Sequence, residues 1–444
     1  MKFPRTPCCL LACAAVFMTA CAGPSRSFRT GLNSRLAVFD YDGALADIEK
    51  AKSSEYSEKN AVLYYLDRGM VLHDAARYQE SDKSLGTAED RMEELFTKSV
   101  SRGAATFLLN DNTTKYAGEV FERALDNVFR ALNFVFLGKT DDALVEARKV
   151  TAYLSRYNAF MQDKSGFRDS AFAQYLSAML FEQNGDRDDA RISYNAASEA
   201  FKTYAADYGM PAPKFSVPDY SRLDELDMGE IVFLHYDGPA PMKVSRTFQV
   251  AWNEAVAAVS ASDVSEEDSA RFRNAVTAGV IGNAITVSYP EYVQDPYMIQ
   301  GSRIKAGEAE AESYMVEDVS AIARQTLDEK NAAIRLRAIA RAAIKFVLAK
   351  EAEAKVEKNA GQGWALLTRV VANVVGAATE VADTRGWTTL PAQIRMARLA
   401  VPPGKQDVKI TFLRSDGVST GITVFKDVVV ERGRRTYLHY RTTQ

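Results

Sequence analysis

A helical phrase recurs four times in the first half of the chain, and it constrains the fold more than any other feature of the sequence. In each copy a polar turn is followed by a small residue, with apolar or small residues four and seven positions further on. This spacing places the apolar side chains on one face of a helix, and the small residue allows close packing against the preceding helix. The small residues are Ala44, Ser81, Ala143 and Ala190.

Apolar segments precede three of these turns, at 63–72, 128–137 and 172–181, and Gly69 within the first would let a neighbouring helix cross tightly. The alternation of helix, turn and helix resembles the tetratricopeptide repeat, a unit of about 34 residues that stacks into a solenoid. The spacings between the small residues are 37, 62 and 47, so such repeats would be irregular. The sequence therefore predicts a tetratricopeptide-like solenoid over residues 28–207, with an unrelated helical bundle as the alternative.

The first 20 residues have the features of a bacterial export signal. Lys2 and Arg5 precede an apolar run that is shorter than the roughly 20 residues of a membrane-spanning helix. The run ends in Met-Thr-Ala-Cys, which resembles the lipobox of bacterial lipoproteins, although methionine stands where leucine is usual. In that family the cysteine receives a diacylglycerol and becomes the new N-terminus. The resemblance implies a signal peptide over 1–20, lipidation of Cys21 and a tether over 21–27.

The composition of the mature chain supports an envelope setting. Every cysteine lies at or before Cys21, so the mature chain has no disulfide and no thiolate metal site. Loss of Lys2 and Arg5 leaves 53 basic against 58 acidic residues, and this net charge of −5 argues against nucleic acid as the main partner. Membrane attachment would then rest on the acyl chains. Ala22, where aspartate would stand in a retained lipoprotein, implies the periplasmic face of the outer membrane.

The second half of the chain mixes strand and helix patterns. Three prolines within 208–228 predict a linker. Residues 229–396 are expected to form a mixed domain with strands at its start, and residues 397–444 a small β-sandwich or β-sheet. The fold class is therefore α+β. Other expected strands lie at 243–250, 284–289, 407–414, 419–430 and 436–441, with an acidic loop at 263–269 and a solvated helix start at 308–312.

A long helix is expected over 316–356. Arg337, Arg341 and Lys345 lie four residues apart along it, and they form either a solvated basic row or an anion site. The following segment, 364–382, is more apolar, but polar residues interrupt it, which favours a buried helix over a membrane span.

A dense mixture of polar and aromatic residues follows at 382–391, an unusual composition for a connecting loop. Asp383 can fix the guanidinium of Arg385 in a charge-assisted hydrogen bond. Trp387 adds a large apolar area, and Pro391 sets the direction of the chain into the next segment. Two interpretations are open: the loop clips the apolar helix onto the β-sheet, or it is a recognition surface for a partner.

Three phrases resemble a known family, at 229–243 (GEIVFLHYDGPAPMK), 337–346 (RAIARAAIKF) and 382–394 (ADTRGWTTLPAQI). The family comprises bacterial lipoproteins of unknown function with tetratricopeptide-like repeats, often encoded beside lipoproteins that activate penicillin-binding proteins. The resemblance implies a cell-envelope setting with a link to peptidoglycan synthesis. It does not indicate a reaction.

Catalytic motifs are absent from the sequence. The chain has three histidines, which stand far apart, and it has no nucleophile elbow, zinc-binding helix or dinucleotide loop. We therefore expect no catalytic residue, metal or cofactor, and a scaffold or adaptor that binds a protein partner through its repeat groove. The alternative is an envelope enzyme such as a glycan hydrolase, for which Asp383 and Glu380 are the carboxylate pair to test.

Overall fold

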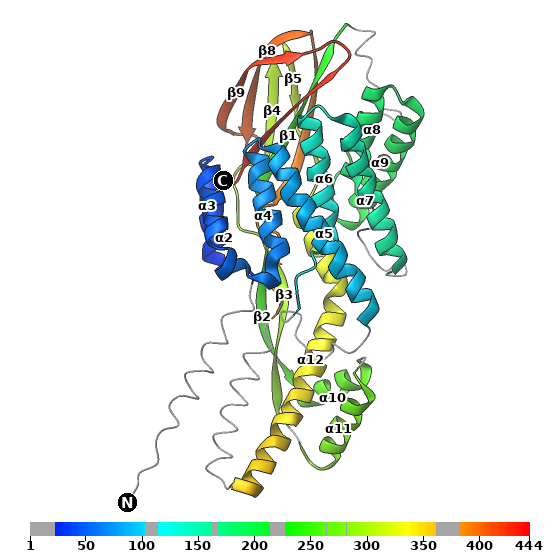
Figure 1. The fold of residues 1–444 in the computed structure, drawn as a ribbon, viewed down its shortest axis with the longest axis vertical. Coiled ribbons are helices and arrows are strands. Elements are labelled where there is room, and N and C mark those ends of the chain that lie inside the picture. Colours follow the sequence, from blue (N-terminus) through cyan, green and yellow to red (C-terminus); the bar gives the residue numbers. More distant parts are fainter. Residues whose placement is uncertain are drawn as a thin grey trace, which may run out of the picture.

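The computed structural model describes residues 23–102, 114–160, 167, 169–213, 227–262, 264–280, 282–360 and 382–444. The expected signal peptide, Cys21, Glu380 and nearly all of the apolar segment 364–382 lie outside the described residues, as does most of the expected linker. The described chain is α+β, with helices in its N-terminal part and sheets in its C-terminal part (Figure 1).

The N-terminal part is a series of helical hairpins in which each helix packs against the next. The small residues Ala44, Ser81, Ala143 and Ala190 are all fully buried, which confirms their predicted place between helices. Gly69 is needed where helices cross, because a Cβ there would lie 2.5 Å from Cδ2 of Leu85. The helices are α2 (Arg26–Ala37), α3 (Tyr41–Lys50), α4 (Ala61–Asp74), α5 (Tyr78–Arg102), α6 (Val120–Phe136), α7 (Thr140–Phe160), α8 (Ala171–Asn184) and α9 (Arg187–Asp207), with short π and 3-10 turns at Lys52–Tyr56 and Glu58–Asn60.

The strands of the described residues form two four-stranded sheets and a separate two-stranded hairpin. Sheet 1 has the order β10-β1-β7-β6, in which the central β1 pairs antiparallel with β7 and parallel with β10. Sheet 2 has the order β5-β4-β8-β9 and is antiparallel. The strands are β1 (Gly229–Pro239), β4 (Gly301–Ala306), β5 (Ala309–Glu312), β6 (Tyr314–Glu317), β7 (Pro391–Val401), β8 (Gly404–Leu413), β9 (Ser419–Val430) and β10 (Arg435–Thr442).

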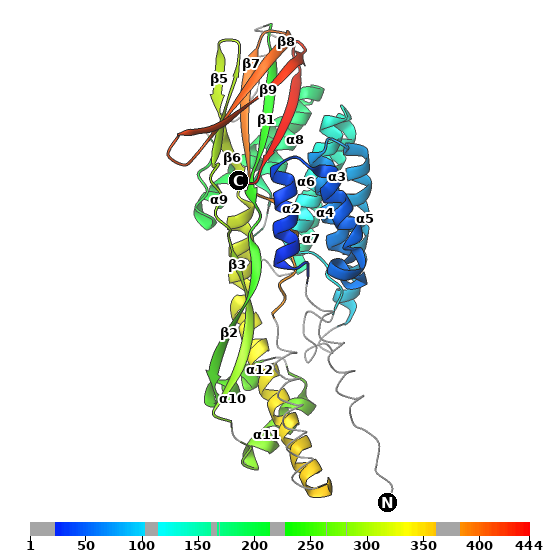
Figure 2. The same cartoon turned by 90° about the vertical axis from the view of Figure 1, so that its left-hand side faces the viewer.

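Sheet 1 lies between the helices and sheet 2 (Figure 2). Strand β1 is buried along its whole length: Val232 and Leu234 join the core shared with the helices, whereas Ile231 and Phe233 join the core shared with sheet 2. Helices α4, α6 and α8 are buried on nearly every side, while α5, α7 and α9 keep one exposed face. Sheet 1 therefore covers the inner face of α4, α6 and α8, which is where the repeat groove predicted from the sequence would lie.

An arm projects from this body (Figures 1 and 2). It consists of the hairpin β2–β3, the helices inserted between those strands, and the second half of α12, and it has its own apolar core around Trp252 and Phe272. The first turns of α12 belong to the body core, so this helix, roughly 63 Å long, connects body and arm. The bounds are β2 (Met242–Ala251), α10 (Trp252–Ala261), α11 (Glu266–Thr277), β3 (Ala284–Val293) and α12 (Val319–Ala360).

Several sequence expectations are wrong in detail. The boundary between 229–396 and 397–444 falls inside β7, and no separate domain exists there because β10 pairs with β1 and β8 with β4. The acidic loop is partly helix, since Ser265 accepts a hydrogen bond from the Asp268 amide and caps α11. The expected helix start at 308–312 is instead a hairpin, in which Arg303 pairs with Glu310 and Glu312 across the strands. The expected tether 21–27 overlaps α2, which begins at Arg26.

None of the described helices has both the length and the apolar character needed to cross a membrane.

Candidate functional site

The loop 382–391 begins with an internal ion pair. The two carboxylate oxygens of Asp383 accept from Nε and Nη2 of Arg385, at 2.9 and 2.7 Å. Arg385 is 2% exposed, and its Nη1 also donates to the Thr114 carbonyl at 2.8 Å. Both oxygens of Asp383 are thus engaged in holding the loop, and Glu380, its partner in the alternative enzyme hypothesis, lies outside the described residues.

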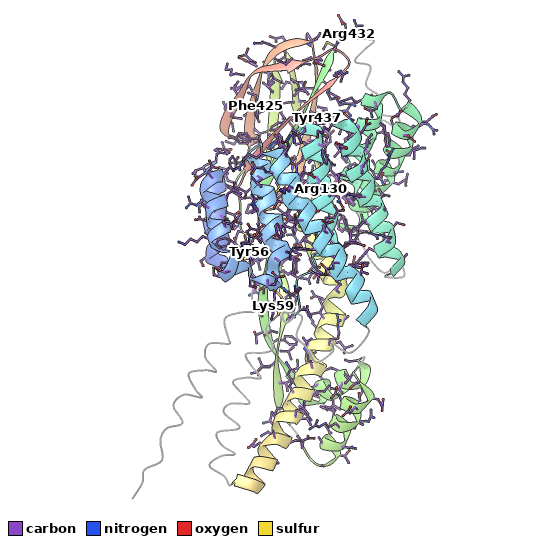
Figure 3. The ribbon with its side chains drawn as sticks, in the orientation of Figure 1. Tyr56, Lys59, Arg130, Phe425, Arg432 and Tyr437 are labelled. Atoms are coloured by element: carbon purple, nitrogen blue, oxygen red, sulfur yellow. The ribbon has the colours of Figure 1, made fainter. Side chains whose placement is uncertain are left out.

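The middle of the loop is bound to helix α4. Asp67, which is fully buried, accepts from the Thr389 amide at 3.0 Å, from the Thr389 hydroxyl at 2.9 Å and from the Thr388 hydroxyl. A further hydrogen bond comes from the hydroxyl of Tyr56 at 2.9 Å (Figure 3 labels Tyr56). Burial raises the pKa of Asp67, and these four donors act in the opposite direction.

Trp387 connects the same loop to α6. Its ring is 3% exposed and meets Phe129 edge to face, and its backbone amide donates to Glu122 at 2.7 Å. Pro391 then begins β7, opposite Pro239 of β1. The loop therefore joins α4 and α6 to sheet 1. These two helices are remote from the loop in sequence, whereas the helix 364–382, which the loop was predicted to clip onto the sheet, lies outside the described residues.

A second polar contact between helices and sheet 1 is centred on Arg435. This side chain, 2% exposed, donates to Glu230 at 2.6 Å, to Glu182 at 2.6 Å and to the Met179 carbonyl at 2.6 Å. Although burial raises the pKa of Glu230, the guanidinium groups of Arg398 and Arg435 lower it below its ordinary value. Arg435 is buried because its guanidinium reaches α8 from the start of β10, whereas its neighbour Arg434 is exposed.

Two of the three histidines meet between the helices and sheet 1, with ring centroids of His73 and His439 separated by 5.0 Å. His73 bonds Asn133 at 2.7 Å and the Tyr236 hydroxyl at 2.9 Å. Burial lowers the pKa of His73 to about 4, so it is neutral at pH 7. His235 lies on the other face of β1. No group of three or more His, Cys, Asp or Glu side chains suited to a metal ion occurs among the described residues.

The basic row of α12 does not join the loop 382–391. Arg337 is exposed, Lys345 is half-buried and Arg341 is only 9% exposed. The expectation of a solvated face is wrong for Arg341, because α12 is surrounded on several sides where it crosses the arm. The row is therefore not a continuous surface.

An open cavity lies on the outer side of the helices, between α5 and α7, with α6 as its floor. Its volume is about 370 Å³. Its carboxylates come from α5 and its cations from α6 and α7, and Met92, Asn127, Ala152 and Tyr153 complete the lining. The charged members are Glu89, Asp90, Glu93, Arg123, Lys149 and Arg156.

Ion pairs hold the walls of this cleft in place. Arg123 donates to Glu93 at 2.8 Å, and Lys149 lies 3.2 Å from Glu89. Arg130 of α6, labelled in Figure 3, pairs with Asp82 at 2.8 Å beside the cleft. Sequence spacing did not indicate this site, since its charges come from three helices whose relative rotation is set by packing. The cleft is therefore a charged surface whose carboxylates and cations already form ion pairs with one another.

No protein-family model, curated protein or solved structure matches this chain.

A buried ion pair connects the body to the arm. Lys243, at the start of β2, donates to Glu119 at the start of α6, and Lys330 of α12 lies 3.6 Å from the same carboxylate. Burial alone would raise the pKa of Glu119, but the two lysines outweigh it and lower the pKa to about 2. The contribution of this ion pair to the free energy of unfolding is therefore fully present above pH 4.5, and it is lost as the pH falls toward 2.

We expect Glu119→Gln to flatten the acid dependence of stability. Between pH 7 and pH 3, the free energy of unfolding of the wild type should fall by about 1–2 kcal/mol more than that of the variant, a modest value because Glu119 is 24% exposed. Urea denaturation at both pH values measures this difference. Glu254→Gln, at an exposed position of α10, should behave as the wild type. Equal acid losses in all three proteins would contradict the assignment.

Proposed function

We propose that this protein is a lipid-anchored adaptor on the periplasmic face of the outer membrane, which binds a segment of a protein partner in the cleft between α5 and α7. The cleft is the observation that carries the proposal. Sheet 1 covers the inner face of α4, α6 and α8, so a partner has access to the outer face, where the cavity of about 370 Å³ lies. This replaces the inner repeat groove as the proposed binding surface.

The helical hairpins support a binding role. Their buried small residues and sequential packing are consistent with an irregular tetratricopeptide-like solenoid, and we propose that architecture for α2 to α9. Solenoids of this kind present rigid surfaces to extended peptides or partner helices.

The chemistry of the cleft favours a partner segment that carries both signs of charge. Glu89 and Glu93 of α5 line one side, and Lys149 and Arg156 of α7 line the other. Such a segment would exchange its own charges for the existing ion pairs between the two walls. Given the resemblance to lipoproteins encoded beside activators of penicillin-binding proteins, we propose peptidoglycan synthesis as the process served.

A site-specific photo-cross-linker tests this proposal. It is placed in cells at Ala152, which lines the cleft, and at Ala206, an exposed alanine of α9 outside it. We expect one envelope protein, identified by mass spectrometry, to cross-link at the first position and not at the second. Equal capture of the same proteins at both positions would contradict a specific cleft.

Charge reversal then tests the chemistry of the same cleft. Arg156→Glu should lower the yield of that cross-link by about tenfold, because it removes a cation and adds repulsion where the partner's carboxylate would lie. Lys202→Glu is the matched control, since Lys202 is also an exposed cation paired with a carboxylate but lies on α9. A similar yield for both variants would contradict the charge-based part of the proposal.

A further inference from the structure

The described chain begins in a fixed position. Gly23 and Pro24 are buried. Gly23 packs closely against the loop 382–391. A Cβ atom added to Gly23 would lie 2.9 Å from Cγ and 3.2 Å from Cα of Arg385. The ion pair of Arg385 with Asp383 holds that side chain in place. Only Ala22 separates Gly23 from Cys21 in the sequence.

The residues that follow are also fixed. The amide and hydroxyl of Ser25 donate to Glu55 at 2.7 and 3.0 Å, and the Ser25 hydroxyl caps α2 by accepting from the Phe28 amide. Arg26 lies 3.3 Å from Asp295, just beyond the end of β3. From Gly23 onward, the chain therefore has no freely moving tether.

We propose that the lipidated Cys21 holds the surface around Gly23 directly against the lipid bilayer, with Asp383 and Arg385 as the socket that fixes the anchored end. This inference rests on the proposed lipidation. A link of two residues reaches at most roughly 7 Å, so lipidation of Cys21 would hold Gly23 at the level of the lipid head groups. The loop 382–391 then has two roles: it joins the helices to sheet 1, and it determines which face of the protein meets the membrane.

The arm restricts the orientation further. It leaves the body beside the start of α2, as the contact of Arg26 with Asp295 indicates, and it extends well past that helix (Figures 1 and 2). If the long axis of the molecule were perpendicular to the bilayer, with Gly23 at the membrane surface, the arm would have to enter the membrane. The outer face of its strand β2 carries the exposed polar residues Ser245 and Thr247. Burying such groups in hydrocarbon is costly. The long axis of the molecule therefore lies along the membrane surface.

The exposed charges near the anchored end have mixed signs, for example Arg26 and Asp295, or Lys115 and Glu58. Each of these described pairs is neutral and adds no attraction to anionic lipid. The orientation consequently depends on the short, fixed link to the acyl chains and not on the charge of the surface.

Fluorescence quenching in vesicles tests this orientation. The only cysteine retained after the signal would be the lipidated one, so an introduced cysteine can be labelled uniquely. Labels are placed at Arg26→Cys, beside the anchor, and at Lys202→Cys, a 66% exposed position of α9, which lies on the opposite side of the molecule from α2 (Figure 1). Both lipidated proteins are reconstituted in phosphatidylethanolamine and phosphatidylglycerol vesicles that contain a head-group quencher. We expect several-fold stronger quenching at position 26.

A linker insertion supplies the control. About twelve glycine and serine residues inserted between Ala22 and Gly23 give a flexible link of about 20 Å, which should reduce the difference between the two labels. Equal quenching of both labels in the parent protein, or an unchanged difference after insertion, would overturn the docked orientation while leaving the anchor intact. If Cys21→Ala still incorporates a palmitate analogue and floats with the vesicles, the anchor itself fails, and the docking proposal fails with it.

Discussion

Trp387→Ala is expected to lower the free energy of unfolding by about 3–5 kcal/mol. The indole is 3% exposed, packs on Phe129, and donates to Thr389 at 3.0 Å, so its removal leaves a large cavity and a hydroxyl that loses one of its partners. Urea denaturation followed by circular dichroism measures the loss. Helix and strand signals should disappear in one transition, because a single apolar core extends from the helices into sheet 1.

Trp252→Ala provides the comparison. Trp252 is 8% exposed and lies in the separate core of the arm. Its removal should destabilise the arm as a small early transition and leave the main one unchanged. If Trp387→Ala instead preserves stability but abolishes partner cross-linking, the loop 382–391 is a recognition surface and its proposed structural role is wrong.

Arg435→Ala should also cost about 3–5 kcal/mol, because it removes one side of a buried ion-pair network. Glu230 and Glu182 would remain inside with fewer donors, and the Met179 carbonyl would lose its hydrogen bond. The free energy of unfolding is again measured in urea. Adding Glu230→Gln should recover part of the lost free energy of unfolding, because that change removes one of the buried carboxylates left with fewer donors.

The neighbouring residue is a close control. Arg434 is 67% exposed and lies 3.4 Å from an equally exposed Glu431. Arg434→Ala should change stability by no more than about 0.5 kcal/mol. Similar losses for Arg434→Ala and Arg435→Ala would contradict the buried network.

Local patterns predicted the elements of this fold well. The spacing around Ala143 and Ala190 identified helix faces that are indeed buried, and the strand expected at 419–430 is β9. The bond between Asp383 and Arg385 was also predictable, because the two residues are close in sequence. Each of these depends on interactions within one element or one turn.

Long-range pairing was the part that the sequence did not reveal. Nothing local indicates that β10 pairs parallel with β1 or that Asp67 and Glu122 accept hydrogen bonds from a loop more than 250 residues away. One signal was available: polar residues such as His73 and Asn133 interrupt the apolar faces of α4 and α6. They indicate a second buried surface on these helices, which sheet 1 occupies.

The same reasoning applies to the candidate cleft. Its walls come from α5 and α7 and its floor from α6, so its lining depends on how three helices are rotated about their axes. Sequence periodicity identifies which side of each helix is apolar, but it does not show which charged residues on the remaining sides will face one another.

The pairing of β1 with β10 has a consequence for the timing of folding. About 200 residues separate the two strands, so β1 lacks one of its neighbours until residues 435–442 have been synthesised. Contacts between such distant segments slow folding, since a long loop must close before they form. Until then the apolar inner faces of α4, α6 and α8 have an incomplete cover, which is a surface prone to aggregation. A chain with this topology benefits from a chaperone that shields its helical part while the rest is being made.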